Sequence, residues 1–582
     1  MDEPNIKVAR PEALRSAWGI RRDSTPFEDS GRATLQKHSS RSKSDLICLL
    51  GLVLLATLIR AWLLCHTEVT SRDSIGFERY AWELQNKNWI SVLHDNVHHP
   101  LYPITILGVS APIRYLVGGS ELEVMQSSAQ LASGLAGILL VIPMFYLGKE
   151  IFDRRVGFWA AAIFQCLPVG ARVMSDALSE SLFLLTTATA LLLAIRAFHS
   201  GSTKEFLACG LCAGLAYLTR PEGILIVAAV GVVFVGRRLF VDRKIFWTQT
   251  AKQLAALALS TAVLAGPYMV IIQGFSNKTT TKDILKSEIR NQKIELAATD
   301  ETQNKHGNPS VFPPCSIRGC FSDFRFRISN FAIWWPDGKV SDLPGHLWWS
   351  VYALASEISK GFFYVVWIPA ILGLWMLRSR LKLWSGETLL LILCLLQCLA
   401  LLRVAMVAGY VADRHVLVIV MCGLYWAAAY VLSLPDLSGV PFLPGKLCLP
   451  PFIVFVVLIG AALPKTLEPL HTNRAGHRAI GLWLAKHLTP GDEVDDAFSW
   501  ATHYAGRTFC DDPGASVPGC NPRYRYVVHD CRPDHRDQFR KHSTPIHNLV
   551  AAGGEVVYHW PEQVPLEEAQ IVLFAVPLAP NK

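Results

Sequence analysis

Long apolar runs are the feature that most constrains what this chain can fold into. Several of them approach or exceed the ~20 residues that a helix needs to cross a bilayer. Hydrophobic residues make up 51% of the 582 residues and charged residues 18%, below the roughly 25% of charged residues usual in soluble domains. A single soluble core of this size is expected to split into domains. We therefore predict a polytopic α-helical membrane protein.

About eleven of these runs are predicted to be transmembrane helices. They lie near residues 45–65, 124–148, 156–171, 177–195, 205–219, 221–236, 253–273, 351–377, 386–402, 415–433 and 450–464. The transmembrane domain is therefore expected to span 45–464.

Lys and Arg cluster in the connections on one side of this arrangement. The positive-inside rule assigns such clusters to the cytoplasm, and residues 1–44 then lie there too. That segment is polar and basic and lacks the apolar core of a signal peptide, so we predict a disordered cytoplasmic tail. The clustered residues are Lys149, Arg154, Arg155, Arg196, Lys204, Arg237, Arg238, Arg243, Lys244, Arg378, Arg380 and Lys382.

Two segments leave the number of crossings open. Residues 101–118 are apolar enough to span, but a span there would move every later basic cluster outside. We prefer a helix at the outer interface or re-entrant there. Residues 205–236 are long enough for one helix, which would also break the parity. A turn at 219–223 avoids this, and Pro221 suits the first turn of a new helix.

The external side then holds a first loop at 66–123, a larger loop at 274–350 and a tail at 465–582. Short turns at 172–176, 219–223 and 403–414 face the same side. The tail alternates β-like runs with a helical stretch, which indicates a small extracytoplasmic α/β domain. The β-like runs are Arg525–His529, Glu555–His559 and Ile571–Val576, and the helical stretch is Arg474–His487. We expect the large loop and the tail to recognise an acceptor.

Five of the 14 cysteines lie in polar segments, namely Cys315, Cys320, Cys510, Cys520 and Cys531. Disulfides are favoured if those segments face an oxidising compartment. Zinc is the alternative, but the spacings match no common ligand pair. An odd number of thiols leaves one over, and the connectivity is not readable from the sequence.

Two further features of the large loop have both an ordinary and a functional interpretation. Asn277-Lys278-Thr279 is an N-glycosylation tripeptide, of a kind that is common by chance. Four tryptophans, at 334, 335, 348 and 349, are typical of an interfacial belt. A sugar-stacking platform is the alternative for the tryptophans.

Ionisable residues gather at the external helix ends. Asp73 follows the first span, and Asp176 and Glu180 lie four residues apart, on one face of a helix that is expected to enter the membrane from outside. Ionisable groups at membrane depth are costly and usually functional. Each of these residues also has an ordinary interpretation. Asp73 could simply belong to a polar loop, and Asp176 and Glu180 could compensate the charge of a helix N-terminus. Residues 413–415 could simply flank a transmembrane helix. The remaining members of the set are Arg220, Glu222, Arg403, Asp413, Arg414 and His415.

This set suits the transfer of a sugar from a polyprenyl phosphate. A carboxylate can take the proton of an attacking acceptor hydroxyl, and cationic side chains can stabilise the departing phosphate. Asp73 is the candidate base. Arg220, Arg414 and His415 are the candidate phosphate ligands.

Four motifs resemble those of the GT-C membrane glycosyltransferases related to protein O-mannosyltransferases and bacterial aminoarabinose transferases. The first loop matches with Asp73, Tyr80-Ala81 and His98-His99-Pro100-Leu101-Tyr102-Pro103, where His99 replaces the family's first proline. The resemblance covers roughly 45–435. The other three motifs are Ser175-Asp176-Ala177-Leu178-Ser179-Glu180, Leu218-Thr219-Arg220-Pro221-Glu222-Gly223 and Tyr410-Val411-Ala412-Asp413-Arg414-His415.

The resemblance implies a helical bundle with an external cavity and an inverting transfer from a polyprenyl-phosphate sugar, with Asp73 as the base. Some relatives use a divalent metal, but the first loop has no Asp-x-Asp motif, so no essential metal or other cofactor is expected. The residues expected to bind substrate are Tyr80, His98, His99, Asp176, Glu180, Arg220, Glu222, Arg414 and His415.

Two other function classes compete with this interpretation. A transporter or lipid flippase predicts ionisable residues near the bilayer midplane and paired broken helices. A membrane-anchored binding protein would need neither the predicted transmembrane helices nor the buried carboxylates. No nucleic-acid motif accompanies the net charge of +8. The expected partners are a lipid-linked sugar and a lipid, glycan or protein acceptor. A bacterial inner membrane is the expected location, with the endoplasmic reticulum as the alternative.

Overall fold

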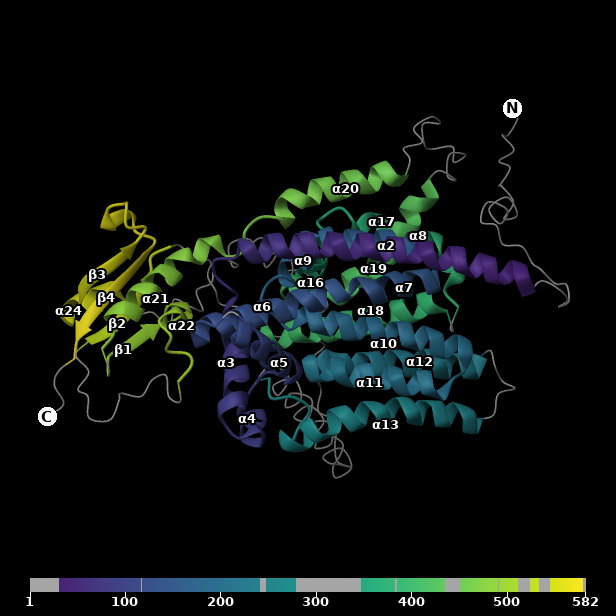
Figure 1. The fold of residues 1–582 in the computed structure, drawn as a ribbon, viewed down its shortest axis with the longest axis horizontal. Coiled ribbons are helices and arrows are strands. Elements are labelled where there is room, and N and C mark those ends of the chain that lie inside the picture. Colours follow the sequence, from purple (N-terminus) through teal and green to yellow (C-terminus); the bar gives the residue numbers. More distant parts are fainter. Residues whose placement is uncertain are drawn as a thin grey trace, which may run out of the picture.

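The structure is a computed structural model in which a body of roughly parallel helices carries a small β-sheet at one end (Figure 1). It describes residues 31–116, 118–240, 247–278, 347–382, 385–434, 451–489, 491–510, 524–532 and 545–578, with side chains from residue 43 onward.

All eleven predicted runs contain helices. Seven helices in the described part of the chain are long and apolar enough to cross a membrane, at 43–65, 121–151, 180–200, 221–240, 247–271, 386–408 and 413–433. The other four predicted runs form shorter helices. The predicted count of about eleven crossings is therefore not established by length and composition. The long segments comprise α2 (Gly31–Cys65), α6 (Glu121–Leu139), α7 (Val141–Ile151), α10 (Glu180–Ser200), α12 (Ile224–Phe240), α13 (Trp247–Ile271), α18 (Gly386–Ala408) and α19 (Leu417–Ser433).

Helix breaks explain why the other four runs are shorter. The run predicted at 156–171 divides into α8 (Arg154–Cys166) and α9 (Pro168–Val173), because Pro168 starts a new helix more readily than it continues one. The run at 351–377 divides into α16 (Leu347–Gly361) and α17 (Trp367–Met376). The last two short helices are α11 (Thr203–Thr219) and α20 (Pro451–Thr466).

The predicted turn between α11 and α12 is present. Arg220 has an extended backbone, and the 3-10 turn η1 (Pro221–Gly223) follows it. A Cβ atom at Gly223 would come within 2.3 Å of the Tyr217 backbone nitrogen, so this close approach requires glycine. The residues on either side of the turn are thereby held against the end of α11.

The first loop forms three helices that pack at the sheet end of the body (Figure 1). They are α3 (Arg72–Asn86), α4 (Trp89–Asp95) and α5 (Leu101–Leu116). The hydroxyl of Tyr102 in α5 donates to the carbonyl of Ala129 in α6 at 2.8 Å. The interfacial or re-entrant placement of this helix stays a prediction.

The C-terminal region contains a four-stranded sheet in the order β1-β2-β4-β3. The predicted strands are present as β2 (Tyr524–Asp530), β3 (Glu555–Trp560) and β4 (Ile571–Pro577). The parallel partner of β2 is β1 (Glu493–Asp496). This strand was not predicted, because its composition is acidic. The other two pairings are antiparallel. The predicted helix is α21 (Ala475–His487), and α22 (Trp500–Tyr504) and α24 (Ile546–Ala551) complete the region.

Both faces of the sheet are covered. Ile480 and Leu484 of α21 pack against Tyr526 and Leu573 on one face. Leu549 of α24 packs with Val527, Val572 and Phe574 on the other. The sheet therefore has its own apolar layers outside the helical body.

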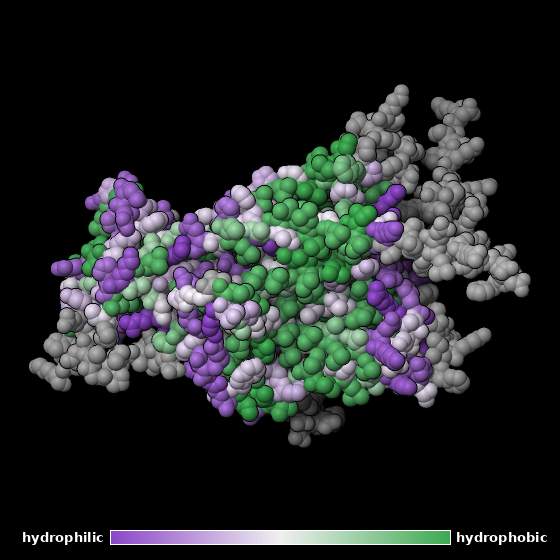
Figure 2. Space-filling model, in the orientation of Figure 1, coloured by the Kyte–Doolittle hydropathy of each residue, from purple (hydrophilic) through white to green (hydrophobic). Residues whose placement is uncertain are grey.

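Apolar side chains dominate the surface of the helical body in the view of Figure 2, and hydrophilic ones gather at its two ends. Large apolar residues such as Leu54, Leu58 and Val263 are at least 60% exposed. An apolar surface of this extent is typical of contact with lipid. The chain is an integral, multi-pass membrane protein.

Several sequence predictions fall partly outside the described residues. Helix α2 begins at Gly31, within the tail predicted to be disordered, and residues 1–30 are not described. Cys510 and Cys531 are free thiols and do not pair with each other. Trp348 is exposed and Trp349 is buried. The residues Cys315, Cys320, Cys520, Trp334, Trp335, Arg243 and Lys244 lie outside the described residues.

Candidate active site

Four separate segments bring charged side chains together at the sheet end of the helical body. Asp73 lies in the first turn of α3, and Glu180 begins α10. Arg220 and Glu222 come from the turn between α11 and α12. Arg414 lies in the 3-10 turn η5 (Asp413–Val416) before α19. Each of these segments was singled out from the sequence, and the structure joins them.

The charges alternate along one chain of contacts. Arg414 Nη2 donates to Asp73 Oδ2 at 2.5 Å, and its Nε lies 3.6 Å from Glu180 Oε1. Arg220 Nη1 donates to the same Glu180 oxygen at 2.6 Å, and its Nη2 lies 3.5 Å from Glu222 Oε1. The order is therefore Asp73, Arg414, Glu180, Arg220 and Glu222.

Exposure is lowest at Glu180 in the middle of this chain of contacts and highest at Asp73. The side chain of Glu180 is 4% exposed and that of Arg220 is 9% exposed, whereas Asp73 is 42% exposed. Buried charges are tolerated when paired, which accounts for the two arginines around Glu180. Asp73 is the accessible carboxylate of the network.

The electrostatic surroundings keep Asp73 ionised. Burial raises the pKa of Asp73, but the charge and hydrogen bond of Arg414 outweigh burial and hold that pKa below its ordinary value of 3.8. The charge of Lys278 acts in the same direction. A carboxylate that is already deprotonated can accept a proton from a bound hydroxyl.

His415 and His98 lie near the network. His415 lines a small cavity with Glu180, Arg220, Glu222 and Arg414, and its Nδ1 accepts from the backbone N–H of Ala412 at 3.3 Å. The ring of His98 stacks at a tilt on Phe77 of α3, with 4.3 Å between centroids. Burial lowers the pKa of His98 to about 4, so His98 is neutral at physiological pH.

Three of the predicted substrate ligands lie outside the charge network and contact other parts of the protein, namely Tyr80, His99 and Asp176. Tyr80 is fully buried in a cluster with Leu84 and Val92. The ring nitrogens of His99 contact the Tyr217 carbonyl at 2.7 Å and the Ser276 hydroxyl at 3.1 Å. These two residues hold the first loop against its neighbours, and a role for them in substrate binding stays a prediction.

The structure corrects the predicted placement of Asp176. This residue precedes α10 rather than sharing a helical face with Glu180. Its Oδ1 accepts from the backbone N–H groups of Ser71 at 3.0 Å and Ala177 at 2.9 Å, and its Oδ2 contacts His471 Nε2 at 2.8 Å. With its acceptors engaged, Asp176 joins the start of the first loop to the segment after α20.

Lys278 is a basic residue near the network that the sequence interpretation treated only as part of a glycosylation tripeptide. Burial lowers the pKa of Lys278, and the charge of Arg220 acts in the same direction. The neighbouring Asn277 is 9% exposed, and its amide nitrogen donates to the carbonyls of His94 and Asn96. That amide is therefore engaged in the fold rather than presented for modification.

The C-terminal region also touches the first loop directly. Trp500 Nε1 donates to the Thr70 carbonyl at 3.0 Å, and Trp500 and Tyr504 pack with Val69 and Ile75. Glu78 Oε2 lies 3.3 Å from His503 Nε2, and both side chains are fully buried. Helix α3, which carries Asp73, is thus fastened to the C-terminal region.

The space inside the network is small, and its donor set does not suit a metal. The cavity between Glu180, Arg220, Glu222 and Arg414 measures about 10 Å³, at the lower limit of what one water molecule needs. Among the described residues, no three His, Cys, Asp or Glu side chains are grouped so as to hold a metal ion. The carboxylates face guanidinium groups instead.

One family model matches part of the chain. The family model for dolichyl-phosphate-mannose-protein mannosyltransferase matches residues 116–265, which include Asp176, Glu180, Arg220 and Glu222 but not Asp73. Comparison with curated proteins found no match.

Solved structures resemble nearly the whole chain. ArnT from Cupriavidus metallidurans, solved with undecaprenyl phosphate, is 13% identical, with a TM-score of 0.54 over 91% of this chain and 97% of that chain. An oligosaccharyltransferase from Archaeoglobus fulgidus, tethered to an acceptor peptide, is 12% identical, with a TM-score of 0.47 over 91% of this chain and 76% of that one. The chain therefore shares the fold of ArnT, and residues 116–265 match the family model for dolichyl-phosphate-mannose-protein mannosyltransferase.

Proposed function

We propose that this protein transfers a sugar from a polyprenyl-phosphate donor to an acceptor hydroxyl, with inversion at the anomeric carbon and Asp73 as the general base. The observation that carries the proposal is the 2.5 Å contact between Arg414 and Asp73 at the exposed end of the charge network. It puts a base and a candidate phosphate ligand side by side. The ArnT structure, solved with undecaprenyl phosphate, supports the donor class.

Donor binding would change the partner of Arg414. A phosphate accepts two parallel hydrogen bonds from a guanidinium, and it competes with Asp73 for Arg414. Arg220 and Lys278 add positive charge next to this position. The donor would thus take up Arg414 and release the carboxylate of Asp73 for the acceptor.

The transfer itself then requires one proton acceptor and one stabilised leaving group. The acceptor oxygen forms a bond to the anomeric carbon while the bond from that carbon to the phosphate oxygen breaks. The hydroxyl proton moves to Asp73, and the electron pair of the broken bond leaves with the phosphate. Arg414 and Arg220 stabilise the charge that develops there, and Glu180 holds both arginines in place.

We propose that no divalent metal is essential, because guanidinium groups occupy the positions next to each carboxylate of the network. We also propose that the network faces the extracytoplasmic side of a bacterial inner membrane and that the N-terminus is cytoplasmic. The support is the set of basic helix ends at the opposite end of the body, which includes Lys149, Arg196 and Arg237.

The test is release of free polyprenyl phosphate by the purified protein in lipid, with a panel of polyprenyl-phosphate sugars and candidate acceptors. We expect Asp73→Asn to reduce the rate at least about a hundredfold and a chelator to leave the wild-type rate unchanged. Asp95→Asn is the matched control, since Asp95 lies in the same loop and is exposed. A rate that survives Asp73→Asn would move the base to another residue, and absence of release with every donor and acceptor would contradict the proposed reaction.

A further inference from the structure

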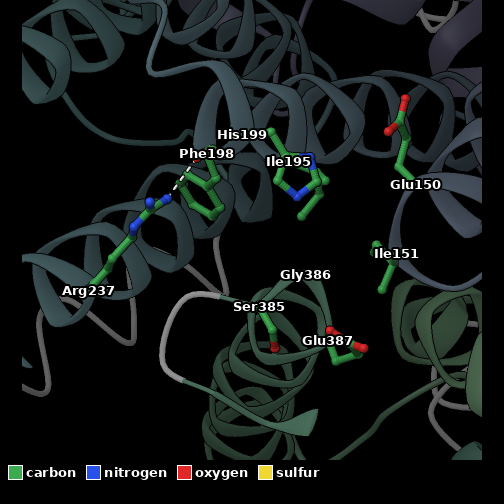
Figure 3. A pocket seen from close by; sticks show the side chains of 9 residues that line it. All are labelled: Glu150, Ile151, Ile195, Phe198, His199, Arg237, Ser385, Gly386 and Glu387. Atoms are coloured by element: carbon green, nitrogen blue, oxygen red, sulfur yellow. Dashed lines mark hydrogen bonds between the residues drawn. The ribbon is translucent and has the colours of Figure 1, made fainter. Parts of the chain in front are cut away.

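A second polar cavity lies at the end of the helical body far from the sheet. It measures about 430 Å³, within the range of small-molecule sites. Four helix ends surround it: the last turns of α7, α10 and α12 and the first turn of α18 (Figures 1 and 3). The transfer chemistry proposed above uses none of these residues.

Glu387 is the residue of this cavity that lacks a counterion. It is 6% exposed and lines the cavity from the second position of α18. Within the described part of the chain, its carboxylate makes no hydrogen bond or ion pair. The amino end of α18 favours a negative charge there, but a buried carboxylate also calls for a cation or a hydrogen-bond donor.

The opposite side of the cavity is basic. Figure 3 shows Arg237 and Glu150 on opposite sides, with the start of α18 between them. Arg237 Nη1 donates to the Phe198 carbonyl at 2.7 Å, which fixes the guanidinium at the cavity wall. Glu150 already faces Arg196 at 3.5 Å. A positive group would therefore meet Glu387, and the guanidinium of Arg237 adds positive charge on another side of the cavity.

The other lining residues are His199, Ser385, Gly386 and three apolar side chains. Ile151, Ile195 and Phe198 line the cavity. Helix α18 packs closely against the end of α7, because a Cβ atom at Gly386 would come within 2.7 Å of Ile151. Basic residues end the surrounding helices, as they do where helices leave a bilayer. A charged headgroup with an apolar continuation fits such a place.

We propose that this cavity binds the headgroup of a phospholipid that carries a primary ammonium group beside its phosphate. The ammonium group donates to Glu387, and the phosphate faces Arg237. The lipid lies in the leaflet opposite the charge network of Asp73 and Arg414. The proposal does not depend on the transfer reaction.

The experiment measures which lipids the purified full-length protein retains, by native mass spectrometry from detergent micelles. Phosphatidylethanolamine and phosphatidylcholine are offered in equal amounts, since the three methyl groups of phosphatidylcholine remove the hydrogen-bond donors of the ammonium group. We expect the wild type to prefer phosphatidylethanolamine, and Glu387→Gln to weaken its retention about tenfold. Glu205→Gln is the matched control, because Glu205 also lies in the first turn of a helix at this end but outside the cavity.

Three results would overturn the proposal. They are equal retention of the two lipids by the wild type, unchanged retention by Glu387→Gln, and competition by soluble O-phosphoethanolamine as strong as that by the lipid. The last would assign the site to a soluble amine. The comparison of the two lipids on the wild type needs no variant, so it remains informative if Glu387→Gln folds poorly.

Discussion

At the residue scale, Asp73 and Arg414 form an ion pair that donor binding has to break. Arg414 lies between Asp73 and Glu180, and it lowers the pKa of Asp73. A base with a depressed pKa is a weak proton acceptor, so the pair alone is not the best catalytic state. Movement of Arg414 to a phosphate would remove this stabilisation and raise the proton affinity of Asp73.

This exchange predicts that kcat and kcat/KM respond differently to acid. The pH profile of kcat/KM reports the free enzyme, in which the pKa of Asp73 is below 3.8. The profile of kcat reports the donor complex, in which Arg414 faces the phosphate. We expect the acid limb of kcat at a higher pH than that of kcat/KM, measured by polyprenyl phosphate release between about pH 4 and 8. Coincident limbs would show that Arg414 stays with Asp73 during turnover.

The charged members of the network could be predicted from the sequence. The sequence could not always distinguish them from buried residues nearby that do not belong to the network. Asp73, Glu180, Arg220 and Arg414 each sit at a helix end that the sequence predicts to be external, and a charge at membrane depth is a strong signal. His99 and Asp176 have partners more than a hundred residues away, which no local pattern reveals.

Tyr80 is different, because its burial could be predicted from the sequence. Phe77, Tyr80, Ala81 and Leu84 follow the spacing of a helical apolar stripe, and all four are buried in α3. The motif that contains Tyr80 therefore reflects the packing of the helix that carries Asp73. Strand β1 was missed for the opposite reason, since its sequence Glu493–Asp496 has three acidic residues among four.

At the element scale, α3 is held between the helical body and the C-terminal region. Trp500 and Tyr504 pack against its start, and Glu78 meets His503 one turn later. The C-terminal region is therefore part of the framework that orients Asp73, in addition to any part in acceptor recognition. Burial raises the pKa of Glu78 to about 8 and lowers that of His503 to about 3, so both groups are mainly neutral at pH 7.

These pKa values predict how the stability of the protein depends on pH. Of the two groups, only Glu78 contributes to this dependence above pH 6.5. The pKa of Glu78 is raised from 4.5 to about 8, so its contribution falls as pH rises through that interval. The contribution of His503, lowered from 6.5, is complete by pH 6.5. Between pH 6.5 and 8 we expect the wild type to lose up to about 2 kcal/mol from this group.

Thermal unfolding of the wild type and of Glu78→Gln across that interval provides the measurement. The amide cannot ionise, so the variant should show a flatter dependence of melting temperature on pH. Glu83→Gln is the control, since Glu83 lies in the same helix and pairs with Arg79 at 3.1 Å. Parallel curves for the wild type and Glu78→Gln would mean that Glu78 is already ionised in the folded protein.

At the scale of the whole molecule, the two ends of the helical body differ in chemistry. The sheet end carries the Asp73 and Arg414 network and the C-terminal region (Figure 1). The other end carries the basic helix termini and the cavity of Glu387. The sequence rule that places basic loops inside therefore predicts the sidedness of the reaction as well as the topology.

Cys531 provides a direct test of this sidedness, because it is an exposed free thiol at the end of β2. If the sheet end is extracytoplasmic, a membrane-impermeant maleimide should label Cys531 in intact spheroplasts and fail to label it in sealed inverted vesicles. The signal of Cys531 is the difference between the wild type and Cys531→Ser. Labelling in inverted vesicles alone would reverse the topology. A donor displayed on the outer leaflet would then be out of reach of Asp73, and the proposed reaction would have to use a cytoplasmic donor.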